Sequence, residues 1–338
     1  MKAIVFERYG SPDYLKLEDA PKPVPGTDDV LIRVHAASIN EWDWGILKRS
    51  PFASRITAGL IRPGKRMLGA DLCGRIEAVG ENVSRFAPDA DVMVDLCRRG
   101  SGRVPEYVGG AFAEYVCVNQ SAVTAKPVML NFEQAASLPQ SGALAVQGFS
   151  YLSKLRKQEL HSGLSILING ASGGTGTLAV QIAKSMGMEV AGVCRTEKMD
   201  AVHSLGADHV IDYTQEDFTK SEKRYDLILD IMGFHSLRDC RRVLKPDGSY
   251  VILGGSDSAA MEAMICGRLF AAIGSKKKTG LLIYQPNEDL DHMAQLVDSG
   301  KVSPVIDKTY SLEQTTEAFR YYTAGHAIGK VIITASPP

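Results

Sequence analysis

The chain has 338 residues, of which 45% are hydrophobic and 23% are charged, and its formal net charge at pH 7 is −1. This length and composition are typical of a protein with two domains and sizeable buried cores. The longest basic run is Lys276–Lys278, so the charge pattern gives no sign of nucleic-acid binding. The six cysteines include no Cys-x-x-Cys pair, which argues against a disulfide framework and a cysteine-rich zinc module.

The N-terminal part of the chain has the pattern of short β-strands. Met1–Phe6 alternate in polarity, and no long apolar segment is present, so we expect neither a secretion signal nor a membrane span, and a cytoplasmic protein. Further β-rich runs separated by Gly, Pro and Asp predict a compact, mostly β unit up to about Val123. These runs are Val30–Ala36, Arg75–Val79, Val92–Leu96 and Ala111–Val118.

A helical pattern extends from about Asn131 to Leu155, and after it the chain alternates strand and helix. Such alternation predicts a parallel sheet with helices on both faces. The expected strands are 165–169, 189–194, 208–211, 225–230 and 249–253, and the expected helices are 175–186, 197–205 and 236–244. Glycines follow the helices, where a left-handed residue commonly closes the last turn; they are Gly187, Gly206 and Gly248.

The C-terminal part is expected to hold a strand near Gly280–Tyr284, a helix at Glu288–Ser299 and a strand at Lys330–Thr334. The residue pattern alone does not decide where this terminal segment docks.

The segment Ser165–Lys184 carries the most informative motif, because an apolar strand leads through a glycine-rich turn into an amphipathic helix. Glycine lets the backbone turn sharply and approach a ligand, and the free N–H groups of the first helical turn face an anion. This context indicates the pyrophosphate site of a dinucleotide, with a purely structural glycine turn as the alternative. The predicted pyrophosphate contacts are Ala171, Ser172, Gly173, Gly174, Thr175 and Gly176.

The end of the next expected strand bears on the choice of cofactor. An NAD site generally places Asp or Glu there, about 20 residues after the glycine turn, to bind the ribose hydroxyls. This chain offers Cys194 and Arg195, and a guanidinium suits the 2′-phosphate of NADPH, which is therefore the expected cofactor. Glu197 weakens this discrimination. In the alternative interpretation, Arg195 and Lys198 are ordinary surface residues at a helix start.

Further motifs follow one another in a specific order: Ala37–Asn40 with Asp43, Gly69–Gly74, Gly110–Tyr115, Ala136–Pro139, Gly170–Gly176, Leu205–Asp208, Val210–Tyr213, Asp230 with Gly233, and Gly329–Ile332. In this order and spacing the chain resembles the medium-chain dehydrogenase/reductase superfamily, and within it the zinc-free quinone oxidoreductases. The resemblance implies a GroES-like, mostly β catalytic domain at residues 1–125 and 286–338, and an α/β Rossmann domain with a doubly wound parallel sheet at residues 126–285. It also implies an active-site cleft between the domains and a homodimer. Further cofactor contacts implied by it are Lys198, Tyr213, Gly233, Gly254 and Lys330.

The resemblance also indicates whether the protein binds a metal ion. Zinc-dependent relatives hold a catalytic ion through a cysteine, a His-Glu pair after a glycine and a later cysteine. The corresponding places in this chain are Asn40, Ala70–Asp71 and Leu138–Pro139, and only Cys97 lies between residues 90 and 116, where those relatives have a four-cysteine lobe. We therefore expect no metal, and a structural role for Asp71.

Without a Lewis acid, an electron-poor quinone or α,β-unsaturated carbonyl is the best match as hydride acceptor. Asn40 is the expected hydrogen-bond donor to the acceptor carbonyl or the nicotinamide ribose, with support from Asp43. Equally, Asn40 can cap a helix that begins near Glu41. The tyrosine that follows this pair in the family is missing here, and Leu144–Ala145 replace its Thr-Ala, so water is the expected proton source.

Aromatic and apolar residues near Asn40 are either a wall for a flat substrate or plain core; they are Trp42, Trp44, Phe52 and Ile56. Ser50–Met67 is expected to be a mobile loop over the cleft. Two other functions stay open. One is carbonyl reduction of the alcohol dehydrogenase type, favoured only if a metal is present, and the other is an NADPH-binding protein with mainly an interaction role.

Overall fold

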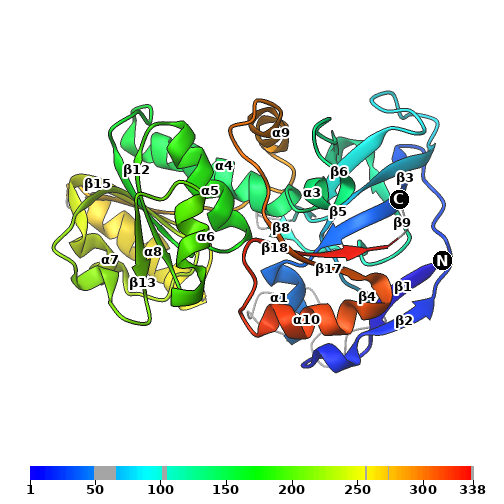
Figure 1. The fold of residues 1–338 in the computed structure, drawn as a ribbon. Coiled ribbons are helices and arrows are strands. Elements are labelled where there is room, and N and C mark those ends of the chain that lie inside the picture. The colour runs from blue at the N-terminus through cyan, green and yellow to red at the C-terminus, as the bar shows by residue number, and fades with distance from the viewer. Residues whose placement is uncertain (49–65, 101–104, 256, 273, 336–338) are drawn as a thin grey trace. The chain divides into compact units, whose positions relative to one another are not determined.

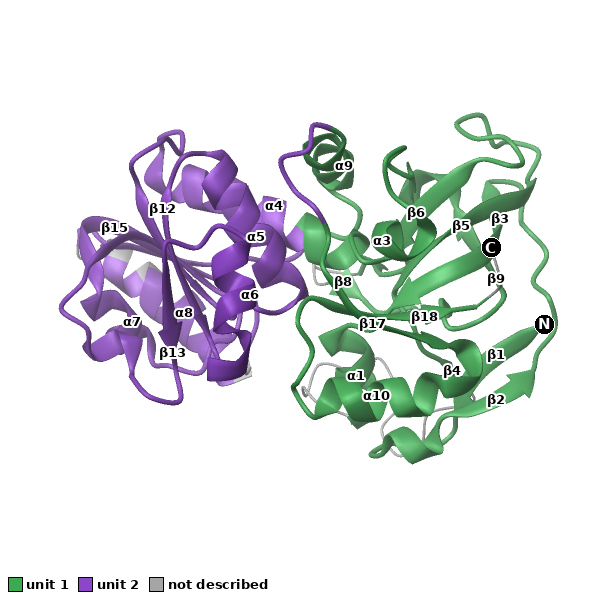
Figure 2. Cartoon of the chain, viewed as in Figure 1, with its two compact units in different colours: residues 1–143, 285–298, 304–338 green, residues 144–284, 299–303 purple. Residues whose placement is uncertain are grey.

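The structure is a computed structural model that describes residues 1–48, 66–100, 105–255, 257–272 and 274–335. The chain divides into two compact units, which Figure 2 shows in different colours. Unit 1 comprises residues 1–143, 285–298 and 304–338, and unit 2 comprises residues 144–284 and 299–303. The predicted boundaries place residues 126–143 in the Rossmann domain, whereas the structure groups them with unit 1. The predicted domain boundaries remain a prediction.

Unit 1 is built around a mixed sheet with the strand order β10-β6-β5-β3-β18-β17, in which β9 also pairs with β3 (Figure 1). The central strand β3 (Asp29–Ser38) pairs antiparallel with β5, β9 and β18. The other strands are β5 (Asp71–Val79), β6 (Asp91–Asp95), β9 (Tyr115–Asn119), β10 (Val123–Ala125), β17 (Ile306–Ser311) and β18 (Lys330–Thr334). The ends of β3, β5 and β18 later supply the polar residues of the candidate site.

Smaller elements complete unit 1. A second sheet has the order β2-β1-β4, and β7 pairs with β8. Their bounds are β1 (Lys2–Phe6), β2 (Lys16–Asp19), β4 (Arg66–Met67), β7 (Arg98–Arg99) and β8 (Pro105–Glu106), and the helices are α1 (Glu41–Lys48), α3 (Phe132–Ala136), α9 (Leu290–Asp298) and α10 (Thr315–Thr323). One apolar cluster joins the sheets to α10, through residues such as Ile32, Phe112 and Phe319. Each such buried side chain contributes about 1.5–3 kcal/mol.

Unit 2 contains a sheet of parallel strands in the order β13-β12-β11-β14-β15-β16. Their bounds are β11 (Ser165–Asn169), β12 (Glu189–Cys194), β13 (His209–Asp212), β14 (Tyr225–Asp230), β15 (Leu244–Ile252) and β16 (Lys278–Leu281). Counted from β11, this is the order 3-2-1-4-5-6 of a Rossmann sheet. The order reverses between β11 and β14, and ligands of such sheets bind at this switch point, outside the carboxyl ends of the strands.

Helices cover both faces of this sheet. They are α4 (Pro139–Arg156), which begins in unit 1, and α5 (Gly174–Ser185), α6 (Met199–Ser204), α7 (Leu237–Arg242) and α8 (Asp257–Ala272). On one face, α7 and α8 pack through Leu237, Cys240 and Ala263 against strand residues such as Ile228 and Tyr250. On the other face, Gly148 of α4 lies over Leu229, and Val202 of α6 lies over Gly192. The near-continuous apolar strands of the sequence are buried on both sides for this reason.

Most expected strands of unit 2 are confirmed, and 165–169, 189–194 and 225–230 have the predicted bounds. Gly187 and Gly206 are left-handed, with φ of +74° and +105°, whereas Gly248 lies inside β15 and closes no helix. The expected helix 131–155 is two helices, because Pro139 cannot donate a backbone hydrogen bond to a preceding turn. The segment Ala111–Val118 is a strand only from Tyr115 onward. The longer elements α8, β17 and α10 were not predicted, and neither were the short strands β2, β4, β7, β8 and β10.

All six cysteines are free thiols. Burial raises the pKa of the Cys73, Cys97 and Cys240 thiols well above the usual range, and raises that of Cys194 to about 11. These four side chains are buried in the two units and are therefore neutral thiols at physiological pH. Within the described part of the chain, no helix is both long enough and apolar enough to cross a membrane.

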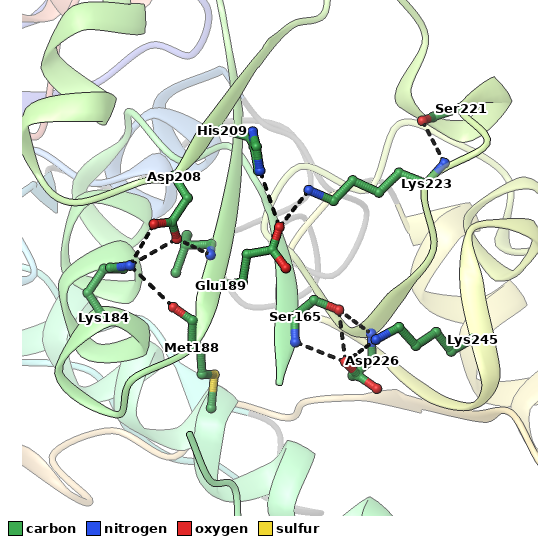
Figure 3. Close-up of polar contacts among 11 residues, drawn as sticks. Ser165, Lys184, Met188, Glu189, Asp208, His209, Ser221, Lys223, Asp226 and Lys245 are labelled. Carbon is green, nitrogen blue, oxygen red and sulfur yellow. Dashed lines mark hydrogen bonds and ion pairs between the residues drawn. The ribbon is translucent and has the colours of Figure 1, made fainter. Parts of the chain in front are cut away.

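The amino edge of the parallel sheet is held by charged hydrogen bonds (Figure 3). Asp226 of β14 accepts hydrogen bonds from the Ser165 N–H at 2.9 Å, the Ser165 hydroxyl at 2.8 Å and the Lys245 ammonium at 2.8 Å. These bonds tie β14 to β11 and β15. Two similar clusters join the neighbouring strands and α5, namely Lys184 with Asp208, and Glu189 with His209 and Lys223.

We predict that Asp226→Asn lowers the free energy of unfolding by about 1 kcal/mol at neutral pH, because a neutral amide accepts weaker and fewer hydrogen bonds. Burial alone raises the pKa of the Asp226 carboxyl, but the bonds from Lys245 and Ser165 outweigh burial and hold that pKa below its ordinary value. Such a carboxylate stabilises the fold above its unfolded-state pKa of about 4, and this contribution disappears as the pH falls through the folded pKa. Urea unfolding should therefore show the difference between wild type and variant shrinking from about pH 6 to about pH 3. A constant difference over that range contradicts the prediction.

Candidate functional site

The glycine-rich turn lies at the carboxyl end of β11, at the switch point of the sheet. Gly170 follows β11 with a left-handed φ of +91°, and α5 begins at Gly174. Gly173 is the N-cap of α5, and because glycine has no side chain it accepts no capping hydrogen bond from the N–H groups of the first turn. The first N–H groups of a helix have no partner within the helix, so this end presents donors and the positive end of the helix dipole to an anion.

Two glycines of this turn have different surroundings. A Cβ on Gly176 would lie 2.1 Å from the carbonyl oxygen of Gly170, so α5 packs directly on the turn and only glycine fits. A Cβ on Gly173 would meet only that same oxygen, at 3.7 Å, among the described residues. There is therefore free space beside Gly173, as the pyrophosphate of a dinucleotide bound at the start of α5 would require. The remaining predicted contacts, Ala171, Ser172 and Thr175, lie in the same turn and are largely buried.

The end of β12 brings two predicted contacts together. Arg195 Nε donates a hydrogen bond of 2.7 Å to the Tyr213 hydroxyl, and both side chains are about half exposed. Glu197 lies 3.9 Å from the same guanidinium. Cys194 is buried, and its carbonyl oxygen accepts from the Tyr213 N–H. Lys198 is only 7% exposed, so it is not an ordinary surface lysine.

Gly233 and Gly254 lie in the loops that follow β14 and β15, at the same carboxyl edge as the glycine turn. The Gly233 N–H donates to the Asp230 carboxylate at 2.9 Å. A Cβ on Gly233 would lie 2.6 Å from the carbonyl oxygen of Gly254, so the two loops touch through their backbones. Unit 2 thus brings its predicted contacts to one edge of one sheet.

Unit 1 holds the other predicted residues in a buried polar cluster. Asn40 is 4% exposed; its Oδ1 accepts from the Lys330 ammonium at 2.5 Å, and its Nδ2 donates to the Ser38 carbonyl at 3.3 Å. A lysine only donates, so the amide oxygen must face it, and this fixes the orientation of the amide. Both bonds run to residues outside α1.

Asp43, the predicted supporting residue, is fully buried in the first turn of α1. Its carboxylate accepts from the Asn40 N–H at 2.7 Å, the Gly69 N–H at 3.0 Å and the Tyr107 hydroxyl at 2.6 Å. Burial raises the pKa of this carboxyl to about 6, against the hydrogen bonds from Tyr107 and Asn40. No sequence pattern pointed to Tyr107, because it comes from a distant segment of the chain.

Lys330, a predicted cofactor contact, lies in the same cluster and is 5% exposed. Its ammonium is 3.7 Å from Asp71 Oδ2, which also accepts from the Ser38 hydroxyl, while Asp71 Oδ1 accepts from the Gln140 N–H. Burial raises the pKa of Asp71, opposed by Lys330 and Asn40, and burial lowers the pKa of Lys330. The cluster therefore joins the ends of β3, β5 and β18 around one ion pair.

The predicted substrate wall is described only in part. Trp44 packs against the core of unit 1, with the Lys48 ammonium 5.5 Å from the centre of its ring. Phe52 and Ile56 lie outside the described residues, as does the expected loop except for β4 at its end. Among the residues that the structure describes, no three His, Cys, Asp or Glu side chains are grouped as a metal ion requires.

Comparison with known proteins places the chain in a family. Residues 26–128 match the family described as alcohol dehydrogenase GroES-like domain, and residues 205–333 match the one described as zinc-binding dehydrogenase. The chain is 32% identical over 342 residues to a 2-methylene-furan-3-one reductase of Solanum lycopersicum, covering 100% of this chain and 80% of that protein. It is also 32% identical over 365 residues to the NAD(P)H oxidoreductase RTN4IP1, mitochondrial, of Mus musculus, covering 98% and 89%. The chain belongs to the medium-chain dehydrogenase/reductase superfamily.

Solved structures of the superfamily agree with this assignment. The quinone oxidoreductase from Coxiella burnetii has a TM-score of 0.82 and 29% identity, covering 99% of both chains. The predicted superfamily and the predicted fold class, a GroES-like domain with a Rossmann sheet, are thereby confirmed. The protein is an oxidoreductase of this superfamily.

We predict that Gly173→Ala weakens NADPH binding about tenfold, because the new methyl group projects into the open space before α5. Its effect on stability should stay below about 1 kcal/mol. Gly176→Ala is the matched change in the same turn, and it should cost about 2 kcal/mol or more of stability, because its methyl group meets the backbone at Gly170. Fluorescence titration and thermal unfolding measure the two effects. Unchanged affinity in Gly173→Ala, or equal losses of stability in both variants, would show that the turn is only structural.

Proposed function

We propose that this protein transfers hydride from NADPH to a quinone or to the C=C bond of an α,β-unsaturated carbonyl, without a metal. The observation that carries the proposal is the uncapped start of α5 at the switch point, with open space at Gly173. Relatives support the choice of acceptor. The chain is 31% identical over 344 residues to the NADPH-dependent alkenal/one oxidoreductase, chloroplastic, of Arabidopsis thaliana, covering 100% of this chain and 80% of that protein.

Each unit has a separate task in this proposal. When bound, the nicotinamide supplies the hydride. The turn 171–176 holds the pyrophosphate, while Gly233 and Gly254 border the same edge of the sheet. Asn40 donates a hydrogen bond to the acceptor oxygen, since its amide stays neutral and Lys330 and Ser38 fix its orientation.

We propose NADPH rather than NADH because of Arg195. Its guanidinium is half exposed and held by Tyr213, so it is available to a 2′-phosphate without a further ordering cost. Lys198 adds positive charge from the following turn. Glu197 is the opposing feature, because its carboxylate lies near the same guanidinium.

Metal independence is part of the proposal because of Lys330. Its ammonium lies 3.7 Å from Asp71, the one carboxylate at the places where the resemblance puts zinc ligands. A second cation beside this ammonium would be repelled, and Asn40 and Asp71 alone are a poor donor set for zinc.

We also propose a homodimer in the cytoplasm. β16 ends the described parallel sheet, so one side of its backbone is available to pair with another chain. The helix α8 contacts β16 and carries exposed apolar side chains, namely Met261, Met264, Ile265 and Leu269. Light scattering of the purified protein tests this assembly.

The function is tested with a panel of quinones, enones, and saturated aldehydes and ketones, each with NADPH and with NADH. We expect NADPH oxidation with quinones or enones, no effect of a chelator, and no stoichiometric zinc in the purified protein. Reduction of saturated carbonyls by a zinc-containing protein would favour an alcohol dehydrogenase-type enzyme. Tight NADPH binding with no turnover over the whole panel would favour a binding role.

For the cofactor, we predict that Arg195→Ala raises the KM for NADPH about tenfold or more and changes the KM for NADH less than about twofold. The reason is that only NADPH has the phosphate that this guanidinium meets. Tyr213→Phe serves as a control that keeps the charge and removes the hydrogen bond to Arg195. Steady-state kinetics with both nucleotides measure the effect, and equal changes for the two would refute the assignment.

A further inference from the structure

The carboxyl end of β14 carries a buried carboxylate that the proposed function does not use. Asp230 is the last residue of β14 and is fully buried. β11 lies on one side, with Asn169 paired to Asp230, and β15 lies on the other, with Ile252 paired to it. Asp230 therefore lies at the switch point, where the order of the strands reverses.

Four uncharged groups donate hydrogen bonds to this carboxylate. Oδ1 accepts from Asn169 Nδ2 at 2.8 Å, the Met232 N–H at 3.1 Å and the Gly233 N–H at 2.9 Å. Oδ2 accepts from the Tyr250 hydroxyl at 2.9 Å. A buried carboxylate needs such donors in place of water, so the anion and its donors hold one another in position.

The donors come from the segments that form the nucleotide edge of the sheet. Asn169 directly precedes the glycine turn, Met232 and Gly233 begin the loop after β14, and Tyr250 lies near the end of β15. The backbone reinforces these links, because the Ile231 N–H donates to the Asn169 carbonyl at 3.1 Å. One side chain thus connects three consecutive segments of the edge.

The loop after β15 depends on the same arrangement. The Leu253 N–H donates to the carbonyl of Asp230 at 2.8 Å. A Cβ on Gly254 would lie 2.7 Å from the carbonyl oxygen of Ile231, so the loops after β14 and β15 are in backbone contact. Any shift of the loop 231–233 therefore displaces its neighbour as well.

We propose that Asp230 is a positioning residue of the nucleotide site, whose carboxylate sets the spacing between the glycine turn after β11 and the loop 231–233 after β14. It acts through Asn169 and Gly233. This inference rests on the proposed function, because it assumes that the nucleotide lies at this edge. Its consequence is that loss of the carboxylate weakens nucleotide binding more than it slows the chemical step.

The same strand offers a matched control at its other end. Asp226 is also a hydrogen-bonded carboxylate of β14 that accepts from a residue of β11, in this case Ser165. It lies at the amino edge of the sheet beside Ser165 (Figure 3), whereas the glycine turn follows the carboxyl end of β11. If these carboxylates only stabilise the sheet, the two substitutions should have the same effect on nucleotide affinity.

The experiment compares Asp230→Asn and Asp226→Asn in the full-length protein. Asparagine keeps the size of the side chain but loses the charge and turns an NH2 group toward donors. We expect Asp230→Asn to raise the Kd and the KM for NADPH about tenfold or more, with kcat changed less than about threefold. Asp226→Asn should leave the Kd within about twofold of wild type. Hydrogen exchange at residues 231–233 should increase only in Asp230→Asn.

Several results overturn the inference. Unchanged affinity in Asp230→Asn does so, as does an equal rise of the Kd in Asp226→Asn. If Asp230→Asn does not fold, Tyr250→Phe replaces it, because this change removes one donor and keeps the carboxylate. We expect Tyr250→Phe to raise the Kd for NADPH about threefold. An unchanged Kd in this variant overturns the inference as well. A wild-type protein that binds neither NADPH nor NADH overturns the proposed function together with this inference. A wild type that binds and turns over, with both variants alike, overturns this inference only.

Discussion

The reversal of strand order between β11 and β14 is the constraint on which unit 2 depends. Right-handed crossovers lead the chain from β11 to one side of the sheet, whereas the strands after β14 are added on the other side. The connections therefore diverge at the carboxyl ends of these two strands and leave room for a ligand there. The glycine turn and the loop 231–233 border that room, and Asp230 lies beneath both of them.

The two units neutralise buried charge in different ways. In unit 2, the Asp230 carboxylate is surrounded by neutral donors from adjacent strands. In unit 1, Asp71 is paired with the ammonium of Lys330, which also binds Asn40. The charge of the Asp230 carboxylate orients the neutral donors around it. The ion pair between Asp71 and Lys330 instead holds together two segments that are far apart in the sequence. Each arrangement makes local geometry depend on one side chain.

The sequence predicts much of unit 2, because its strands are apolar on both faces and its turns are marked by glycine. The strand 225–230 and the turn at Gly170 are examples, since local pattern alone specifies them. Elements that pack through a few residues were missed, and α8 is the clearest case, because its many exposed apolar residues give no amphipathic pattern. Gly248 shows a different error, since a glycine after a helical pattern here belongs to a strand.

The hydrogen-bond partners of Asn40 and Asp43 could not be predicted from the sequence, for a related reason. Asn40 and Asp43 belong to a short recognisable motif, but Lys330 reaches them only because β18 pairs with β3. Tyr107 likewise meets Asp43 only through the tertiary fold. Contacts of this kind are fixed by sheet pairing across the chain, and neither periodicity nor spacing within one segment records them.

The buried cysteines have a consequence for an enzyme with this proposed chemistry. Quinones and conjugated carbonyls are electrophiles that alkylate thiolates, whereas protonated sulfur is a poor nucleophile. Cys73, Cys97, Cys194 and Cys240 keep their protons because burial away from water disfavours the charged thiolate. The packing that stabilises the two units thus also shields these four sulfur atoms from covalent inactivation by the very molecules that the protein is proposed to reduce.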